Sequence, residues 1–229
     1  MKKVLVAVAH ADDEILGAGG TIARFSKDHE VYVLIVTDSC SSQYRGQDVE
    51  KIIEEKKKCA VKANNLVGVK KVIYSDLPDM ALRETPHTKI NAVIEKAIDE
   101  IKPQIILTHH FGDVNLDHQE VYKSVMVAAR PTQYTSVEKI YTFEVLSATE
   151  WQSSDTRYAF IPNTYIDISD SIEKKIDALM EYSQEIREYP HPRSAEAIRN
   201  LAKFRGQSVG MKYAEALCLV RDVKRKECL

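Results

Sequence analysis

A short apolar run at residues 4–8 is followed without a break by the segment Ala9-His10-Ala11-Asp12-Asp13-Glu14. The run is aliphatic and rich in β-branched residues, and Gly17, Gly19 and Gly20 follow, so the pattern predicts a buried parallel strand that leads into a helix. Open α/β sheets bind their ligands at the carboxyl ends of strands. Here that position has an imidazole and three carboxylates, which would repel a phosphate and favour a cation.

Strand-like runs recur along the chain, and amphipathic stretches lie between the first four of them. The runs cover residues 3–9, 31–37, 71–75, 104–109 and 140–145, and residues 49–67 and 90–101 each have one apolar stripe. Alternating strands and helices favour right-handed crossovers and a mainly parallel sheet with helices on both faces. The C-terminal third, from about residue 169, is predicted as helices interrupted at Pro190 and Pro192. We therefore expect one α/β domain over residues 1–229.

Charge and cysteine usage exclude several classes of protein. The net charge of −2 gives no general attraction to nucleic acid or to an anionic membrane. No apolar stretch is long enough to span a bilayer, and the first strand begins too early to leave room for a signal peptide. The four cysteines form no C-x-x-C pair, so a zinc knuckle or redox motif is not indicated. Free thiols and a cytoplasmic location are the expectation.

Two strand ends have clusters of metal-ligand residue types. His10 and Asp13 are three residues apart at the first strand-to-helix turn, and His118 lies at the start of the helical stretch that follows the strand at residues 104–109. A single Asp or His at a helix start is usually a cap or a surface group, but two such clusters at neighbouring strand ends favour a shared ion. Imidazole and carboxylate ligands suit Zn²⁺, and a catalytic zinc site takes three protein ligands. The pattern predicts zinc on His10, Asp13 and His118.

These motifs resemble the LmbE/PIG-L family of metal-dependent deacetylases. The similarity rests on His10-Ala11-Asp12-Asp13-Glu14, on Gly17-Ala18-Gly19-Gly20-Thr21, and on Asp117-His118 after the fourth strand. It implies a Rossmann-like fold, zinc held by His10, Asp13 and His118, and Asp12 as the general base. It also implies a small-molecule substrate with an N-acetylglucosamine-type unit on a lipid, nucleotide, thiol-conjugate precursor or glycoside. Relatives often form homo-oligomers, so this chain is a candidate for one.

The residue that donates a hydrogen bond to the oxyanion in many family members is replaced in this chain. Many members have a histidine three residues before the last ligand as the partner of the oxyanion, and this chain has Asn115. An amide can donate a hydrogen bond but cannot titrate. His191, between Pro190 and Pro192, is the preferred substitute, and His110 is the next candidate. The second oxyanion donor is thus open among Asn115, His191 and His110.

Three further residues are candidates for substrate binding. Asp79 matches a family aspartate near the site, although an aspartate beside Pro78 also fits a turn. Arg45 and Arg193 have the chemistry to bind substrate hydroxyls or a phosphate. The lysine run at residues 56–58 is predicted to be a solvated helix face.

Two other functions fit parts of the pattern. A nucleotide-binding module would use the glycines at residues 17–20, but a dinucleotide fingerprint needs them in the turn itself, and here they fall inside the helix. A phosphoesterase would use acidic strand ends to hold Mg²⁺ or Mn²⁺, whereas two histidine ligands favour zinc. Release of acetate by a zinc-loaded protein, against release of phosphate with Mg²⁺, separates the two enzyme classes.

Overall fold

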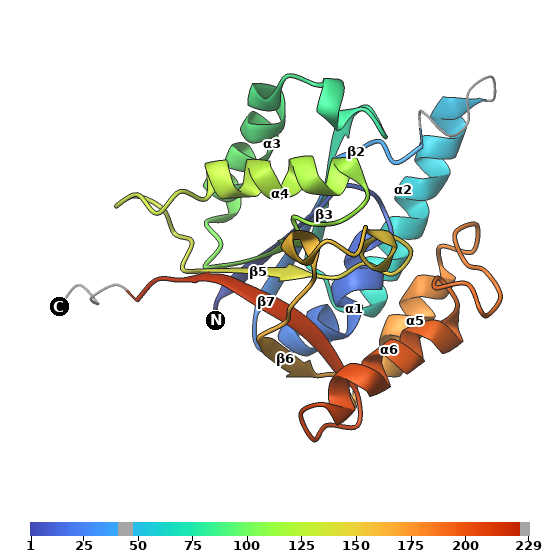
Figure 1. The fold of residues 1–229 in the computed structure, drawn as a ribbon. Helices are drawn as coiled ribbons and strands as arrows, with labels where there is room; N and C mark the ends of the chain where they lie inside the picture. Colours follow the sequence, from blue (N-terminus) through green and yellow to red (C-terminus); the bar gives the residue numbers. More distant parts are fainter. Residues whose placement is uncertain (41–47, 225–229) are drawn as a thin grey trace.

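The computed structural model describes residues 1–40 and 48–224, and these ranges form an α/β fold around one seven-stranded sheet (Figure 1). The strand order is β3-β2-β1-β4-β5-β7-β6. The strands are β1 Lys3–Val8, β2 Glu30–Thr37, β3 Lys71–Leu77, β4 Ile105–His109, β5 Lys139–Phe143, β6 Thr164–Asp167 and β7 Ala214–Asp222. β1 pairs in parallel with β2 on one side and with β4 on the other. The chain therefore changes direction across the sheet between β1 and β4, which is where open α/β sheets place their ligand sites.

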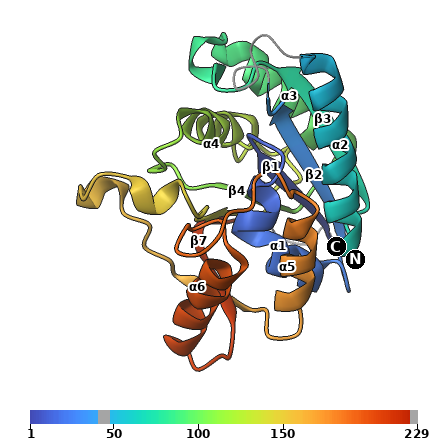
Figure 2. The same cartoon turned by 90° about the vertical axis from the view of Figure 1, so that its right-hand side faces the viewer.

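Helices cover both faces of this sheet, as predicted (Figure 2). Those in the described ranges are α1 Asp13–Phe25, α2 Val49–Leu66, α3 His87–Ile101, α4 Leu116–Ala128, α5 Ile172–Met180 and α6 Ala195–Gln207. One apolar cluster joins the sheet to α1, α2, α5 and α6, and the other joins it to α3 and α4. Among the described residues, no helix combines the length and the apolar character needed to cross a membrane.

β1 supplies both clusters because side chains alternate between the faces of a strand. Val4, Val6 and Val8 lie in the first cluster, and Leu5 and Ala7 lie in the second; all five are fully buried. A strand buried on both faces has no polar alternation, which explains the continuous apolar run in the sequence.

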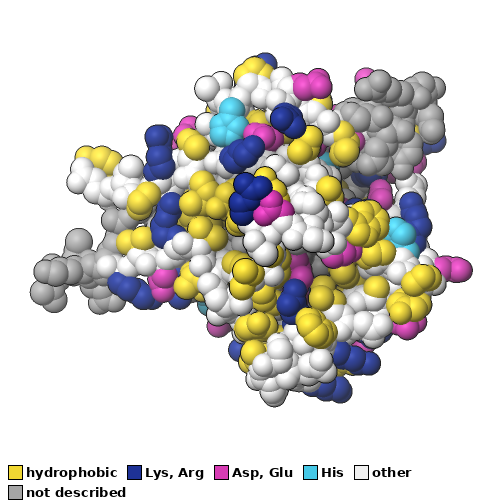
Figure 3. Space-filling view, viewed as in Figure 1, with side chains coloured by type: hydrophobic (Ala, Val, Ile, Leu, Met, Phe, Trp, Pro, Cys, Tyr) yellow, Lys and Arg dark blue, Asp and Glu magenta, His cyan; other side chains and the backbone are white. Residues whose placement is uncertain are grey.

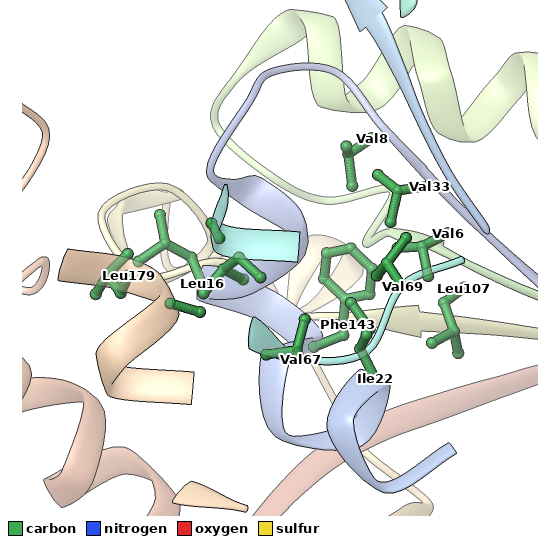
Figure 4. Packing of buried hydrophobic residues seen from close by; sticks show 14 of the residues in the cluster. Val6, Val8, Leu16, Ile22, Val33, Val67, Val69, Leu107, Phe143 and Leu179 are labelled. Carbon is green, nitrogen blue, oxygen red and sulfur yellow. The ribbon is translucent and has the colours of Figure 1, made fainter. Parts of the chain in front are cut away.

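Close contact between α1 and the sheet depends on the glycines of α1. A Cβ at Gly17 would overlap the ring of Phe143 on β5, and a Cβ at Gly20 would lie 2.8 Å from Ile168. Figure 4 shows Phe143 beside Ile22 and Val6 in this layer. The prediction that these glycines lie inside the helix is confirmed, and this arrangement excludes their use as a phosphate-binding turn.

A buried ion pair supports α1 where its helical dihedral angles are interrupted at one residue. The Glu215 carboxylate accepts hydrogen bonds from the backbone N–H groups of Gly20 (2.9 Å) and Thr21 (2.6 Å). Lys175 Nζ pairs with Glu215 at 2.6 Å and donates to Leu16 O at 2.8 Å. These contacts satisfy backbone groups that the interruption would otherwise leave unpaired. The first turns of α1 are thereby held in place.

The expectation for the C-terminal third is right for α5 and α6 but wrong for β7, and β6 just before it was also not predicted. β7 runs antiparallel to β5 and to β6, so the sheet is mixed beyond β5. The first residues of β7 include Ala214, Glu215 and Ala216, which have low β-propensity. Pairing with two neighbouring strands, rather than local preference, makes this segment a strand.

The surface agrees with the near-neutral charge of the chain. Figure 3 shows basic and acidic side chains interspersed over the visible face, with hydrophobic side chains between them. No large field of one sign covers that face.

Candidate metal and active site

The fold brings His10, Asp13 and His118 together at the carboxyl ends of β1 and β4. Asp13 Oδ2 lies 3.2 Å from His10 Nδ1 and 3.1 Å from His118 Nε2. Asp13 is the first residue of α1, and His118 is in the first turn of α4. Asp13 and His118 are buried, and His10 is partly exposed. One ligand atom from each residue can therefore face a common point.

A carboxylate lies behind each of the two histidines. His10 Nε2 lies 3.1 Å from Asp117 Oδ2 and 3.3 Å from Asp79 Oδ1, and His118 Nδ1 lies 3.1 Å from Asp113 Oδ2. A neutral imidazole has one N–H and one lone pair, so an acceptor at one nitrogen directs the lone pair to the other. Carboxylates in this position orient metal-binding histidines and increase their basicity. The free lone pairs then belong to His10 Nδ1 and His118 Nε2, the two atoms that face Asp13.

These supporting carboxylates are themselves fixed. Asp117 Oδ2 accepts the backbone N–H of Met80 at 2.7 Å, and its Oδ1 accepts that of Leu82 at 3.0 Å. Asp113 Oδ2 accepts the hydroxyl of Thr149 at 2.9 Å. Asp117 therefore supports His10 from the chain position next to His118. The sequence indicated Asp117 only as part of a motif and gave no sign of Asp113.

Electrostatics make the cluster strongly polar. Burial lowers the pKa of both histidines, but the surrounding carboxylates together outweigh it. Asp117, Asp13 and Asp79 raise the pKa of His10 to about 10, and Asp13 and Asp113 raise that of His118 to about 9. Burial would raise the pKa of Asp13, but the nearby imidazoles hold it well below its usual range. Asp13 Oδ1 is buried and has no hydrogen-bond partner among the described residues. This donor set and the orphaned oxygen fit a divalent cation of the zinc type.

His109 is a further buried neighbour that the sequence did not single out. Its ring stacks on His118 with centroids 3.8 Å apart, and its Nε2 accepts the backbone N–H of Ala9 at 2.9 Å. Burial and the nearby His118 hold the pKa of His109 well below its usual range, so the ring stays neutral. His109 therefore packs against a candidate ligand while it ties β4 to the end of β1.

Asp12 lies next to this cluster in a different environment. It precedes α1, but its side chain does not cap the helix; instead Oδ2 accepts a hydrogen bond from Arg193 Nη1 at 2.8 Å. Arg193 Nη1 also contacts Glu185 Oε2 at 3.1 Å, and its Nε donates to Ser147 Oγ at 2.7 Å. Burial raises the pKa of Asp12 to about 6 although Arg193 acts in the opposite direction. The backbone of Asp12 has φ of 124°, a conformation that costs a non-glycine residue about 1–3 kcal/mol.

A pocket of about 60 Å³ opens onto these groups. The solvated-face prediction is wrong for Lys56, whose side chain is only 12% exposed, lies 3.0 Å from Glu185 Oε1 and donates to Ser39 O at 2.7 Å. Helix α2 turns this one lysine of the run toward the pocket, whereas Lys58 remains exposed. The lining residues are His10, Ala11, Asp12, Ser39, Lys56, Met80, Asn115, Glu185 and Arg193.

Candidates for the second oxyanion donor lie in different places. Asn115 lines the pocket, and its Oδ1 accepts the N–H of Asp117 at 2.9 Å. His110 Nε2 lies 2.9 Å from the backbone oxygen of Tyr158, so that nitrogen is engaged outside the pocket. His191 packs against Trp151, and its Nδ1 accepts the N–H of Arg193 at 3.0 Å.

The three candidates for substrate binding also differ in their position relative to the pocket. Arg193 reaches the pocket, and Asp79 is fully buried behind His10, where burial raises its pKa. Arg45 lies outside the described residues. Lys56 and Glu185 were not predicted to belong to the site. No local sequence pattern identifies either residue, because the packing of α2 and of the segment after α5 brings these side chains to the pocket.

Comparison with known proteins gives a family match over the part of the chain that contains His10, Asp13 and His118. The model of the PIG-L family, described as GlcNAc-PI de-N-acetylase, matches residues 5–129. Diacetylchitobiose deacetylase of Thermococcus kodakarensis is 24% identical over 233 residues, which cover 97% of this chain and 85% of that protein. The uncharacterized deacetylase YaiS of Escherichia coli is 28% identical over 137 residues, which cover 56% of this chain and 69% of the relative.

Solved structures share the fold at lower identity. N,N'-diacetylchitobiose deacetylase from Pyrococcus horikoshii superposes with a TM-score of 0.78 at 21% identity, covering 96% of this chain and 84% of the other. The conserved protein TT1542 from Thermus thermophilus gives 0.77 at 21% identity, covering 98% and 97%. GalB, a 4-carboxy-2-hydroxymuconate hydratase from Pseudomonas putida, gives 0.73 at 19% identity over the full length of both chains. Because a hydratase has this fold too, the fold alone does not define the reaction.

Proposed function

The chain belongs to the PIG-L family, and on that premise we propose that it is a metal-dependent amidohydrolase that removes an acetyl group from an N-acetylated amino sugar or its conjugate. The observation that carries this proposal is the convergence of His10, Asp13 and His118 beside a pocket that His10 and Asp12 line. The description of the family and the names of the deacetylase relatives support an acetylated amino sugar as the substrate class.

We propose zinc as the resident metal, held by His10 Nδ1, by Asp13 and by His118 Nε2. Asp117 and Asp113, which lie behind His10 and His118, and the orphaned Asp13 oxygen support this assignment. When bound, zinc lowers the pKa of water toward about 7 and polarises the amide carbonyl. Asp79 and Asp117 are assigned to orienting His10 rather than to a second ion, since His10 has a single lone pair to donate.

Asp12 is proposed as the general base and acid. Its carboxyl is buried next to the candidate ligands, and its pKa of about 6 leaves it ionised near neutral pH. Asp12 can therefore accept the proton of the attacking water and return it to the leaving nitrogen. Arg193 holds the carboxylate in place through one oxygen.

Asn115 is the best-placed of the three candidates for the second oxyanion donor. Because its Oδ1 accepts the N–H of Asp117, its amide N–H₂ is free to face the pocket that it lines. A donor at this point would stabilise charge on the oxygen of the tetrahedral intermediate. His191 is not among the residues that line the pocket, and its Nδ1 accepts the N–H of Arg193; His110 would have to leave the Tyr158 carbonyl.

Charged and polar groups at the pocket suit a sugar. Lys56 and Arg193 both contact Glu185, and Arg193 also pairs with Asp12. The two positive and two negative charges balance, so the pocket offers hydrogen bonds to hydroxyl groups without a net charge that would demand a phosphate. The free sugar, a glycoside and a nucleotide-linked form all remain within this substrate class.

The test is a panel assay. Zinc-loaded protein is incubated with N-acetylglucosamine, diacetylchitobiose, a nucleotide-linked N-acetyl sugar and a phosphate monoester, and released primary amine, acetate and phosphate are measured. The proposal predicts equal amounts of amine and acetate from at least one acetylated sugar and no phosphate. Phosphate release without amine would replace it with the phosphoesterase alternative.

A further inference from the structure

Glu14 is a buried carboxylate beside the site whose role the proposed chemistry leaves unassigned. Its Oε2 accepts the backbone N–H of Asp12 at 3.1 Å. Its Oε1 accepts Asn64 Nδ2 of helix α2 at 2.7 Å and the hydroxyl of Tyr182 at 2.6 Å. The side chain is fully buried, so these three donors replace water for it. Glu14 therefore joins the start of α1 to α2 and to the segment after α5.

Only a group that accepts on both oxygens satisfies all three donors. A glutamine at this position would turn an N–H₂ group toward either Asp12 N–H or the Asn64 amide. Asn64 cannot rotate its amide in response without losing its second hydrogen bond, from Nδ2 to Ala60 O at 2.9 Å. Three donors therefore face Glu14, and both of its oxygens accept hydrogen bonds.

The contact to Asp12 acts where the backbone is most unusual. Asp12 has φ of 124°, in the region that L-residues rarely adopt, and its N–H is the group that Glu14 holds. In this conformation the Asp12 side chain turns away from the first turn of α1 and reaches Arg193. A relaxed backbone would allow the usual alternative, in which an aspartate at this position caps the helix.

We propose that Glu14 is a positioning residue, whose carboxylate holds the Asp12 backbone in the conformation that directs the Asp12 side chain into the pocket. This inference rests on the role proposed for Asp12. Tyr182 extends the same network toward Glu185 and Arg193, which follow it in the chain, so one carboxylate aligns the base and the segment that contains its counter-ion.

The competing interpretation is that Glu14 only stabilises the fold. Its test compares Glu14→Gln with Tyr182→Phe, which removes one donor to Oε1 and leaves the contact to Asp12 in place. If Glu14 positions Asp12, Glu14→Gln lowers kcat on the order of 10²-fold, with KM and zinc content unchanged, and Tyr182→Phe has a much smaller effect on kcat. A purely structural role predicts that both variants lower Tm. It also predicts that neither variant lowers kcat when the assay temperature is well below the Tm.

A double-mutant cycle with Asp12→Asn tests whether Glu14 acts through Asp12. Once the base is absent, Glu14→Gln should cause no further loss of kcat, whereas independent effects would multiply. If Glu14→Gln does not fold, Glu14→Asp takes its place, because its shortened carboxylate cannot reach Asp12 and α2 together. Multiplying losses would overturn the proposal.

A crystal structure of the Glu14→Gln variant gives a readout that needs no turnover. The expected result is a changed φ at Asp12 and loss of the Asp12–Arg193 contact. An Asp12 that keeps its positive φ and its contact to Arg193 would overturn the inference. Should the wild-type protein release no amine from any acetylated sugar, the proposed function fails, while the structure of the variant still decides whether Glu14 positions Asp12.

Discussion

At the scale of single residues, Asp12 and Asp13 show how neighbours in the chain acquire different properties. Asp13 lies among imidazoles, which offset the effect of burial and hold its pKa well below its usual range. Asp12 lies beyond them, and burial raises its pKa to about 6 against the effect of Arg193. Carboxylates with separated pKa values are suited to separate tasks. The first fits a metal ligand, and the second fits a base.

Asp12→Asn should retain zinc and the fold and lose about 10²–10⁴-fold in kcat, as expected when a general acid–base group is removed. Metal analysis and kcat on the best acetylated sugar of the panel check this. Asp76→Asn is a matched control, because Asp76 is exposed and lies outside the pocket. A near wild-type kcat for Asp12→Asn would instead direct attention to Asp117.

Arg193→Gln should move the acid limb of kcat/KM to higher pH. The positive charge of Arg193 favours the ionised form of Asp12, so its removal raises the pKa of Asp12 and more base is protonated at a given pH. Glu185→Gln is the opposite control, because the negative charge of Glu185 raises the same pKa. Limbs that shift in the same direction in both variants would contradict this electrostatic account.

At the scale of elements, the position of α1 determines where Asp13 and Asp12 lie. Gly17 has no side chain, which allows the helix to pack closely on the Phe143 ring of β5. The ion pair of Lys175 and Glu215 holds the interrupted middle of the same helix. A shift of α1 would therefore move the candidate ligand at its first residue.

Gly17→Ala should destabilise the protein by about 1–3 kcal/mol, the usual cost of overpacking a well-packed core. Gly19→Ala is the comparison variant: its new methyl group would lie 3.1 Å from Lys175 Cγ and 3.3 Å from Ile15 Cγ2, against 2.2 Å from the Phe143 ring at Gly17, so it should lose less stability. Urea unfolding of both variants measures the difference. Equal stabilities would show that α1 can move away from the sheet without cost.

At the scale of the whole molecule, the candidate metal site joins segments that are far apart in the chain. His10 and Asp13 follow β1, and His118 lies in the first turn of α4, about a hundred residues later. An ion bound by all three would link these loops in the folded state only. Metal binding should therefore be coupled to stability.

Zinc added to chelator-treated protein should raise the Tm, because a ligand at 100 times its Kd stabilises the folded state by about 2.7 kcal/mol. Differential scanning calorimetry with and without zinc measures this effect. His118→Ala should abolish the increase, and His29→Ala, at a histidine away from the cluster, should preserve it. An equal increase in His118→Ala would place the bound ion elsewhere.

The sequence predicted the parallel part of the fold because its signals are local. The apolar runs of β1, β2 and β4 are buried on both faces, so their character is visible without knowledge of their neighbours. β7 was missed because its first residues have little strand preference, and pairing with β5 and β6 decides its conformation. The prediction of a solvated face for the lysine run was wrong at Lys56 for a similar reason: the packing of α2, which no local pattern shows, turns this side chain toward the pocket.

The sequence by itself determined which residues lie at the ends of β1 and β4, since a strand followed by a helix fixes the position of the turn between them. It therefore identified His10, Asp13 and His118 as residues that meet. Only the tertiary structure decided what surrounds them: Asp113 and Asp117 behind the histidines, Arg193 and Glu185 at Asp12, and Asn64 and Tyr182 at Glu14. These partners come from separate elements, and their contacts depend on packing distances that no local pattern encodes.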